Sequence, residues 1–131
     1  LMACQQTDRI CYGIELDELE QTSVKLLHSK TGAALAEHVF CEPKEECDAI
    51  FSHTTGKAGM TKLDKILYLA DYMEPTRDFD GVEELRRLVW EDLDQAMILG
   101  LEMSIEELKE RGVPVHRNTL AALEDLQRRQ Q

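Results

Sequence analysis

Aromatic residues and proline are scarce in this sequence, and long apolar runs are missing. Aromatic residues make up 5% of the 131 positions, and there are three prolines. No apolar stretch approaches the roughly 20 residues that cross a bilayer, and no signal peptide is visible. We therefore expect a helical protein located in the cytoplasm, with no membrane partner.

The four cysteines do not form a recognisable framework. They lie at positions 4, 11, 41 and 47, and no two of them form a C-x-x-C pair. Disulfide scaffolds and zinc sites have closer, paired spacings. We expect reduced, structural thiols.

Basic residues are also fewer than acidic ones. The chain has 15 Lys and Arg residues against 26 Asp and Glu residues, which gives a formal net charge of −11. Such a protein has no broad electrostatic attraction for nucleic acid. It can still bind a nucleotide where a metal ion or a few local cations neutralise the phosphates.

Helical periodicity dominates what is present. The length and the 43% hydrophobic content fit one domain, residues 1–131, with a modest core. Strand alternation and internal repeats are not found, so we predict an all-α bundle of five to seven helices. The expected helices are 24–40 with an interruption or entry near Thr31-Gly32, 45–52, 61–73, 82–103 with Trp90 at its edge, a short helix begun by a capping box at Ser104 and ended at Gly112, and a last helix capped by Thr119. In addition, residues within 1–12 would suit the tail of a helix, and 15–20 is expected to form an acidic turn.

The stretch 52–78 holds the residues with the most chemical meaning. Within the 61–73 helix, an apolar face is expected, with Thr61 as N-cap and Pro75 ending the helix. Asp71 falls near the edge of that face, partly shielded but able to reach a cleft. The alternative is that Asp71 is an ordinary solvated acid. The predicted face comprises Leu63, Ile66, Leu67, Ala70 and Met73.

A histidine and two threonines precede this helix. His53-Thr54-Thr55-Gly56 offers hydroxyl and backbone N–H donors that suit phosphate oxygens. The same letters also describe a helix exit with Gly56 after it. The following residues do not have the spacing of a phosphate-binding P-loop. His28 lies alone on its predicted helix, where a surface or core role is the usual one.

Several segments together resemble one family. LLHSKTGAALA (26–36), HTTGKAGM (53–60), LDKILYLADYMEPTRDFDGVEELR (63–86) and DLDQA (92–96) occur in the order and spacing of the YqeK family. These are HD-domain phosphohydrolases that split diadenosine tetraphosphate symmetrically into two ADP. The resemblance implies an HD-type helical fold and a divalent metal cofactor, with iron expected and two ions in the intact family.

The resemblance also implies a role for each matching residue. Asp71 corresponds to a catalytic, metal-binding aspartate, and His28, His53 and Thr54 to residues near the substrate phosphates. Arg77 matches an arginine that contacts the nucleotide. A second possibility is that the two histidines join the metal cluster. The segment near the base or ribose consists of Pro114, Val115, His116, Arg117, Asn118 and Thr119.

One departure from the family pattern stands out. The family's first metal-binding histidine and its His-Asp pair precede the matched region, and no histidine precedes position 28 here. Because these upstream residues are missing, the resemblance implies the C-terminal two-thirds of a family member, either a fragment or a degenerate copy. One carboxylate is too few ligands for a metal, so the metal can be absent.

Three functions follow as hypotheses. The first is an enzyme whose partner molecule is a dinucleoside polyphosphate or its product ADP, and the resemblance leaves a homodimer open. The second is a nucleotide-binding remnant without catalysis. The third is a helical interaction module. No nucleic acid is expected as a partner of any of them.

Overall fold

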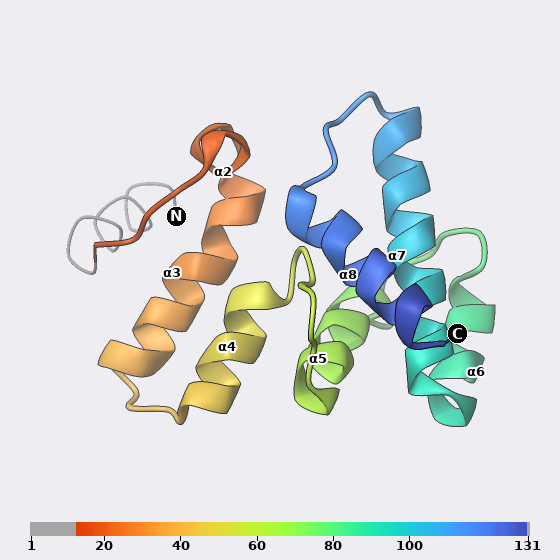
Figure 1. The fold of residues 1–131 in the computed structure, drawn as a ribbon, viewed down its shortest axis with the longest axis horizontal. Helices are drawn as coiled ribbons and strands as arrows, with labels where there is room; N and C mark the ends of the chain where they lie inside the picture. The colour runs from red at the N-terminus through yellow and green to blue at the C-terminus, as the bar shows by residue number, and fades with distance from the viewer. Residues whose placement is uncertain (1–12, 131) are drawn as a thin grey trace. The chain divides into compact units, whose positions relative to one another are not determined.

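The computed structural model describes residues 13–130, apart from the side chain of Val24. Within this range it contains seven α-helices and no strand (Figure 1), so the all-α prediction is confirmed. The helices separate into two compact units, the first ending at Thr54 and the second beginning at Thr55. A single domain over 1–131 stays a prediction. The helical tail expected within 1–12 lies outside the described residues.

The first unit is built on a helical hairpin. Helix α3 (Val24–His38) and helix α4 (Lys44–Ser52) lie side by side in opposite directions (Figure 1). Glycine at position 32 permits this approach, since a Cβ there would lie 3.3 Å from Ile50 Cγ2. The expected interruption at Thr31-Gly32 is therefore wrong: α3 is continuous, and the Thr31 hydroxyl donates to the backbone carbonyls of its own preceding turn.

A short helix closes one end of the hairpin. Helix α2 (Glu18–Thr22) begins with a capping box in which Asp17 and Glu20 each accept from the other's backbone N–H. Lys30 of α3 links α3 to α2, because its Nζ lies 2.6 Å from Glu20 Oε2 and donates to the Glu15 carbonyl at 2.7 Å. The acidic turn expected at 15–20 is thus a helix shifted slightly toward the C-terminus.

The second unit is arranged around its longest helix. Helix α7 (Leu93–Glu110) contacts α5 (Lys62–Tyr72), α6 (Val82–Glu91) and α8 (Arg117–Arg129). Gly100 lets α5 approach α7, since a Cβ there would meet Leu69 Cδ2 at 3.1 Å. The buried core contains Met60, Tyr68, Leu69, Leu85, Ala96, Met97, Leu101, Ala122 and Leu126.

Two helix boundaries differ from the prediction. The expected helix 82–103 is two helices, because Asp92 adopts an extended backbone and its side chain accepts from the Gln95 N–H as the N-cap of α7. Ser104 lies inside α7, so the predicted capping box there is wrong. Leu101 and Ile105 are buried on either side of it and keep the helix continuous. Trp90 is 89% exposed and covers no helix edge.

The buried face of α5 also differs from the prediction. Thr61 is the N-cap, with a capping box to Asp64, and the helix ends at Tyr72 ahead of Pro75, as expected. However, Ile66 is 45% exposed and Ala70 is exposed, so the predicted face is wrong. The buried residues are Asp64, Tyr68 and Leu69.

A buried carboxylate explains why the spacing of apolar residues did not predict the buried face of α5. Asp64 is 1% exposed, and its Oδ2 accepts from the Thr61 N–H and lies 3.4 Å from the Lys57 ammonium. The buried stripe of α5 therefore combines a carboxylate with a tyrosine and a leucine, and the sequence does not show it as a purely apolar stripe.

The last helix begins earlier than predicted. His116, and not Thr119, is the N-cap of α8, with its Nδ1 accepting from the Asn118 N–H at 3.0 Å. Thr119 lies in the first turn and is buried. Over the described residues, no helix is both long enough and apolar enough to cross a membrane.

Candidate functional site

Two histidines meet in the first unit. His28 lies in the second turn of α3 and His53 is the C-cap of α4, and the antiparallel hairpin brings these positions together although they are 25 residues apart. Their Nε2 atoms lie 3.1 Å apart, the ring centroids are 5.0 Å apart, and both residues are half-buried. Two of the predicted site residues therefore form a pair.

The backbone of α4 orients one of these rings. His53 Nδ1 lies 2.6 Å from the Ile50 carbonyl oxygen, which can only accept, so Nδ1 carries a proton and donates it. In the neutral ring, the His53 Nε2 is then an acceptor, so His28 donates to it from its own Nε2 at 3.1 Å. A backbone carbonyl holding one imidazole nitrogen is a common way of presenting the other nitrogen to a metal ion.

A hydroxyl pair lies beside the histidines. Thr54 Oγ1 donates to Ser29 Oγ at 3.3 Å, and Ser29 Oγ donates to the Leu26 carbonyl at 3.1 Å. Thr54 is half-buried, whereas Ser29 is 3% exposed. The first unit thus brings together His28, His53 and Thr54, and it adds Ser29.

The other predicted site residues belong to the second unit. Asp71 lies in the last turn of α5 and is exposed, so the expected partial shielding is wrong. It lies on the solvent side because Tyr68 and Leu69 take the buried positions of that turn. Arg77 follows in the loop before α6, is exposed, and its N–H donates to the Glu74 carbonyl at 2.9 Å.

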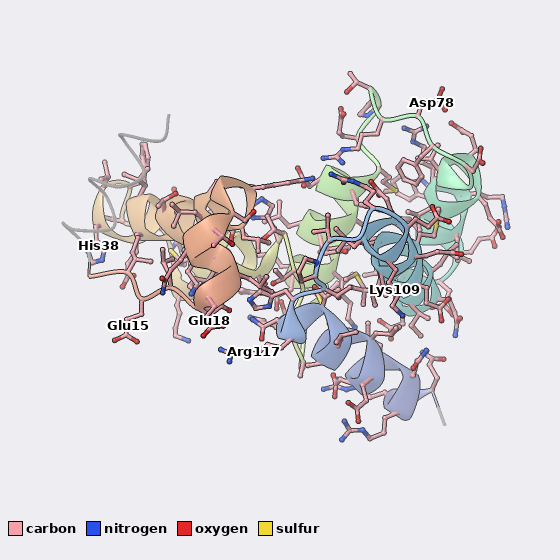
Figure 2. All side chains as sticks on the ribbon, turned by 90° about the horizontal axis from the view of Figure 1, so that it is seen from above. Glu15, Glu18, His38, Asp78, Lys109 and Arg117 are labelled. Atoms are coloured by element: carbon pink, nitrogen blue, oxygen red, sulfur yellow. The ribbon has the colours of Figure 1, made fainter. Side chains whose placement is uncertain are left out.

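The segment 114–119 divides between a loop and a helix. Pro114 and Val115 precede α8, His116 caps it, and the remaining three residues begin it. Arg117 is exposed and extends from the first turn of α8 (Figure 2), while Asn118 is half-buried. Within residues 13–130, no hydrogen bond or ion pair joins Asp71 or Arg77 to this segment.

Aromatic rings pack beside Asp71 and Arg77. Tyr68 and Tyr72 stack with centroids 6.2 Å apart, and Tyr72 lies 5.1 Å from the Phe79 ring. Burial raises the pKa of Tyr68 to about 12, with a hydrogen bond from Ser104 opposing it. Burial, helped by Glu107, also raises the pKa of Tyr72 to about 12. Both phenols therefore stay neutral around pH 7.

Comparisons with known proteins identify the family. No protein-family model matches the chain. It is 40% identical over 96 residues to "Bis(5'-nucleosyl)-tetraphosphatase, symmetrical" of Bacillus subtilis, covering 72% of this chain and 52% of the relative. It is 38% identical over 122 residues to the protein of that name in Halalkalibacterium halodurans, covering 92% of this chain and 60% of the relative.

A solved structure agrees in fold. A crystal structure described as a "predicted HD superfamily hydrolase involved in NAD metabolism", from Clostridium acetobutylicum, matches 97% of this chain and 68% of its own chain, with 35% identity and a TM-score of 0.89. The chain belongs to the YqeK-type family of HD-domain hydrolases. It spans about half to three-fifths of the length of the curated relatives it matches.

Membership of the YqeK-type family confirms the sequence resemblance and the HD-type helical fold. The roles of the individual site residues stay predictions. The sequence analysis missed Ser29. Its position directly after His28, on the same predicted helix, was the signal that could have pointed to it. The sequence analysis also missed Arg86, which donates hydrogen bonds to the backbone carbonyls of Met73 and Arg77. The spacing of apolar residues carries no information about such bonds.

Proposed function

We propose that the whole protein represented by this chain hydrolyses dinucleoside tetraphosphates symmetrically, releasing two nucleoside diphosphates. The names of the curated relatives support this activity. Because the chain spans only part of those relatives, the activity is assigned to the whole protein. The chain itself contributes metal-binding and phosphate-binding residues.

The observation that carries the proposal is the His28–His53 pair. Two nitrogen ligands at about 2.0–2.1 Å from one ion lie roughly 2.9–3.4 Å apart, depending on the coordination angle. The two Nε2 atoms are 3.1 Å apart, and the Ile50 carbonyl holds the His53 proton on Nδ1, so its Nε2 carries the lone pair that a metal ion in place of the shared proton would bind. The pair therefore fits two ligand positions of a single divalent metal ion, which the HD fold implies.

This geometry favours one of the two alternatives left open by the sequence. Phosphate oxygens are acceptors, so a histidine that contacts them must donate a proton from the nitrogen facing them. His53 already donates from Nδ1, and a second donor would require a charged ring facing His28. Metal ligation uses the lone pairs of both Nε2 atoms and avoids placing two N–H donors opposite each other at 3.1 Å, so we assign both histidines to the metal.

The remaining residues receive complementary roles. When bound, the metal, which we take to be iron, polarises a phosphoryl oxygen and lowers the pKa of a water molecule. Asp71, in the second unit, is proposed as a catalytic, metal-binding residue, and Thr54, in the first, as a hydroxyl donor to phosphate oxygens. Arg77 supplies a guanidinium to the phosphates, and residues 114–119 are assigned to the base or ribose.

Two further expectations accompany this function. Cys41 and Cys47 are free thiols, which fits the reducing conditions of the cytoplasm. Burial and the nearby acids, led by Glu37, raise the pKa of the Cys47 thiol, so it remains protonated and unreactive. We keep a homodimer as a possible assembly and expect neither nucleic acid nor membrane as a partner.

The experiment compares two proteins. One is the 131-residue chain, and the other is this chain joined to the segment of the Halalkalibacterium halodurans relative that it does not match. Each is incubated with diadenosine tetraphosphate and a divalent metal, and the products are separated. We expect the joined protein to release ADP alone, and to lose this activity when His53 is replaced by Asn.

Each other outcome assigns a different function. Release of AMP together with ATP would contradict symmetrical cleavage. ADP binding that persists after chelation, without turnover in either protein, would favour a nucleotide-binding remnant. If neither metal nor nucleotide raised the unfolding temperature, the chain would be better described as a helical interaction module.

A further inference from the structure

The loop between α5 and α6 is held by one side chain. This segment, residues 73–81 (the 73–81 loop), follows Asp71 closely and carries Arg77, while Asp78 projects from its outer side (Figure 2). Arg86 of α6 donates from Nε to the Met73 carbonyl at 3.1 Å. Its Nη2 donates to the carbonyls of Glu74 and Arg77, each at 2.9 Å.

The guanidinium suits this arrangement better than any other side chain would. Its Nε and Nη2 groups form one rigid edge with donors at fixed spacing, so a single residue donates to three carbonyls that lie between α5 and α6, outside either helix. The remaining Nη1 donates to Glu83, one turn earlier on α6. Arg86 is 27% exposed, which limits competition from water.

The Arg77 side chain stays available while its backbone is fixed. Arg77 is exposed, and no ion pair within residues 13–130 involves its guanidinium. Its backbone N–H is bound by the Glu74 carbonyl and its own carbonyl by Arg86. Ordering this backbone before a ligand arrives removes part of the entropy that binding would otherwise cost.

We propose that Arg86 is a positioning residue that holds the 73–81 loop so that Arg77 is ready to bind the phosphates of a nucleoside diphosphate. The inference deepens the proposed function and rests on it for the identity of the ligand. Arg86 itself faces backbone carbonyls and acts only through Arg77.

The chain offers a matched control for this proposal. Arg87 is the next residue on α6, is exposed, and pairs only with Glu91 four residues later. Arg86→Lys and Arg86→Gln are compared with Arg87→Lys and Arg87→Gln. The lysine variant retains the charge and the aliphatic stem, so folding is preserved while the three-carbonyl contact is lost.

Two measurements are made on the 131-residue chain. Hydrogen exchange follows the amides of the 73–81 loop against those of α7, and calorimetry gives the Kd for ADP. For both Arg86 variants we expect loop exchange to accelerate and the Kd to rise by about tenfold or more, with α7 still protected. Adding Arg77→Ala to Arg86→Lys should weaken binding no further than Arg77→Ala alone. The Arg87 variants should match the wild type.

The possible failures can be told apart. Unchanged loop exchange in Arg86→Lys would overturn the inference whatever happens to ADP. Faster exchange with an unchanged Kd would show that Arg86 orders the loop without serving Arg77, and would also overturn it. If the wild-type chain does not bind ADP at all, the proposal that Arg77 binds nucleoside diphosphate phosphates in this chain is overturned, whereas the proposed function is overturned only if the joined protein also fails to release ADP.

Discussion

Replacing Leu69 by Ala tests which face of α5 is buried. Leu69 is 1% exposed, and its Cδ2 faces Gly100, which has no side chain to fill a gap. Removing three carbons at about 0.8 kcal/mol each costs about 2.4 kcal/mol. The cavity that remains raises the loss to roughly 3–4 kcal/mol, within the range seen for buried leucines.

The assay is urea unfolding followed by far-ultraviolet circular dichroism. The single tryptophan, Trp90, is 89% exposed and would report poorly on packing. A loss of 3 kcal/mol lowers the midpoint by roughly 1–3 M at ordinary denaturant slopes. Ile66→Ala, at a residue that is 45% exposed, should cost less than about 1 kcal/mol. A larger loss for Ile66→Ala than for Leu69→Ala would refute the assignment of the buried face.

Two further predictions concern backbone strain and pH. Gly56→Ala should destabilise the protein more than Gly59→Ala, by about 1 kcal/mol or more. Both glycines have positive φ, but only at Gly56 would a new Cβ meet a neighbour, 3.2 Å from Ala122 Cβ. Equal losses of stability in the two variants, measured by thermal unfolding, would exclude the packing contribution. Tyr68 and Tyr72 have folded-state pKa values of about 12 against an unfolded value of about 10. The folded state therefore binds more protons between these values, so their contribution to stability is complete below about pH 10 and is lost as the pH rises toward 12. Tyr68→Phe should reduce this alkaline loss of stability, and an unchanged alkaline unfolding profile would contradict it.

Local signals predicted the helices best where capping chemistry and periodicity agreed. Thr61 and Pro75 marked the limits of α5, and α4 was found almost to the residue. The errors arose where tertiary contacts decide. The S-x-x-E pattern at Ser104 is overridden by the buried Leu101 and Ile105, and Gly32 is a close-packing position and not a helix break.

The candidate site divides in the same way. The HTTG motif made His53 and Thr54 candidates for the site, but the contact of His53 with His28 depends on the antiparallel hairpin, which brings together positions 25 residues apart. The orientation of the His53 ring depends on one backbone carbonyl. Arg86 could not be found from periodicity, because its role lies in hydrogen bonds to backbone carbonyls of another segment.

The central claim is that His28 and His53 hold one divalent metal ion. The most direct measurement is titration of the 131-residue chain with Co²⁺, following the visible absorption bands of the bound ion. His38, an exposed histidine at the end of the same helix α3 (Figure 2), provides the control. We expect His28→Ala and His53→Ala each to weaken Co²⁺ binding by at least about tenfold, while His38→Ala leaves it unchanged. Undiminished binding and an unchanged spectrum in the His28→Ala/His53→Ala double variant would contradict the account.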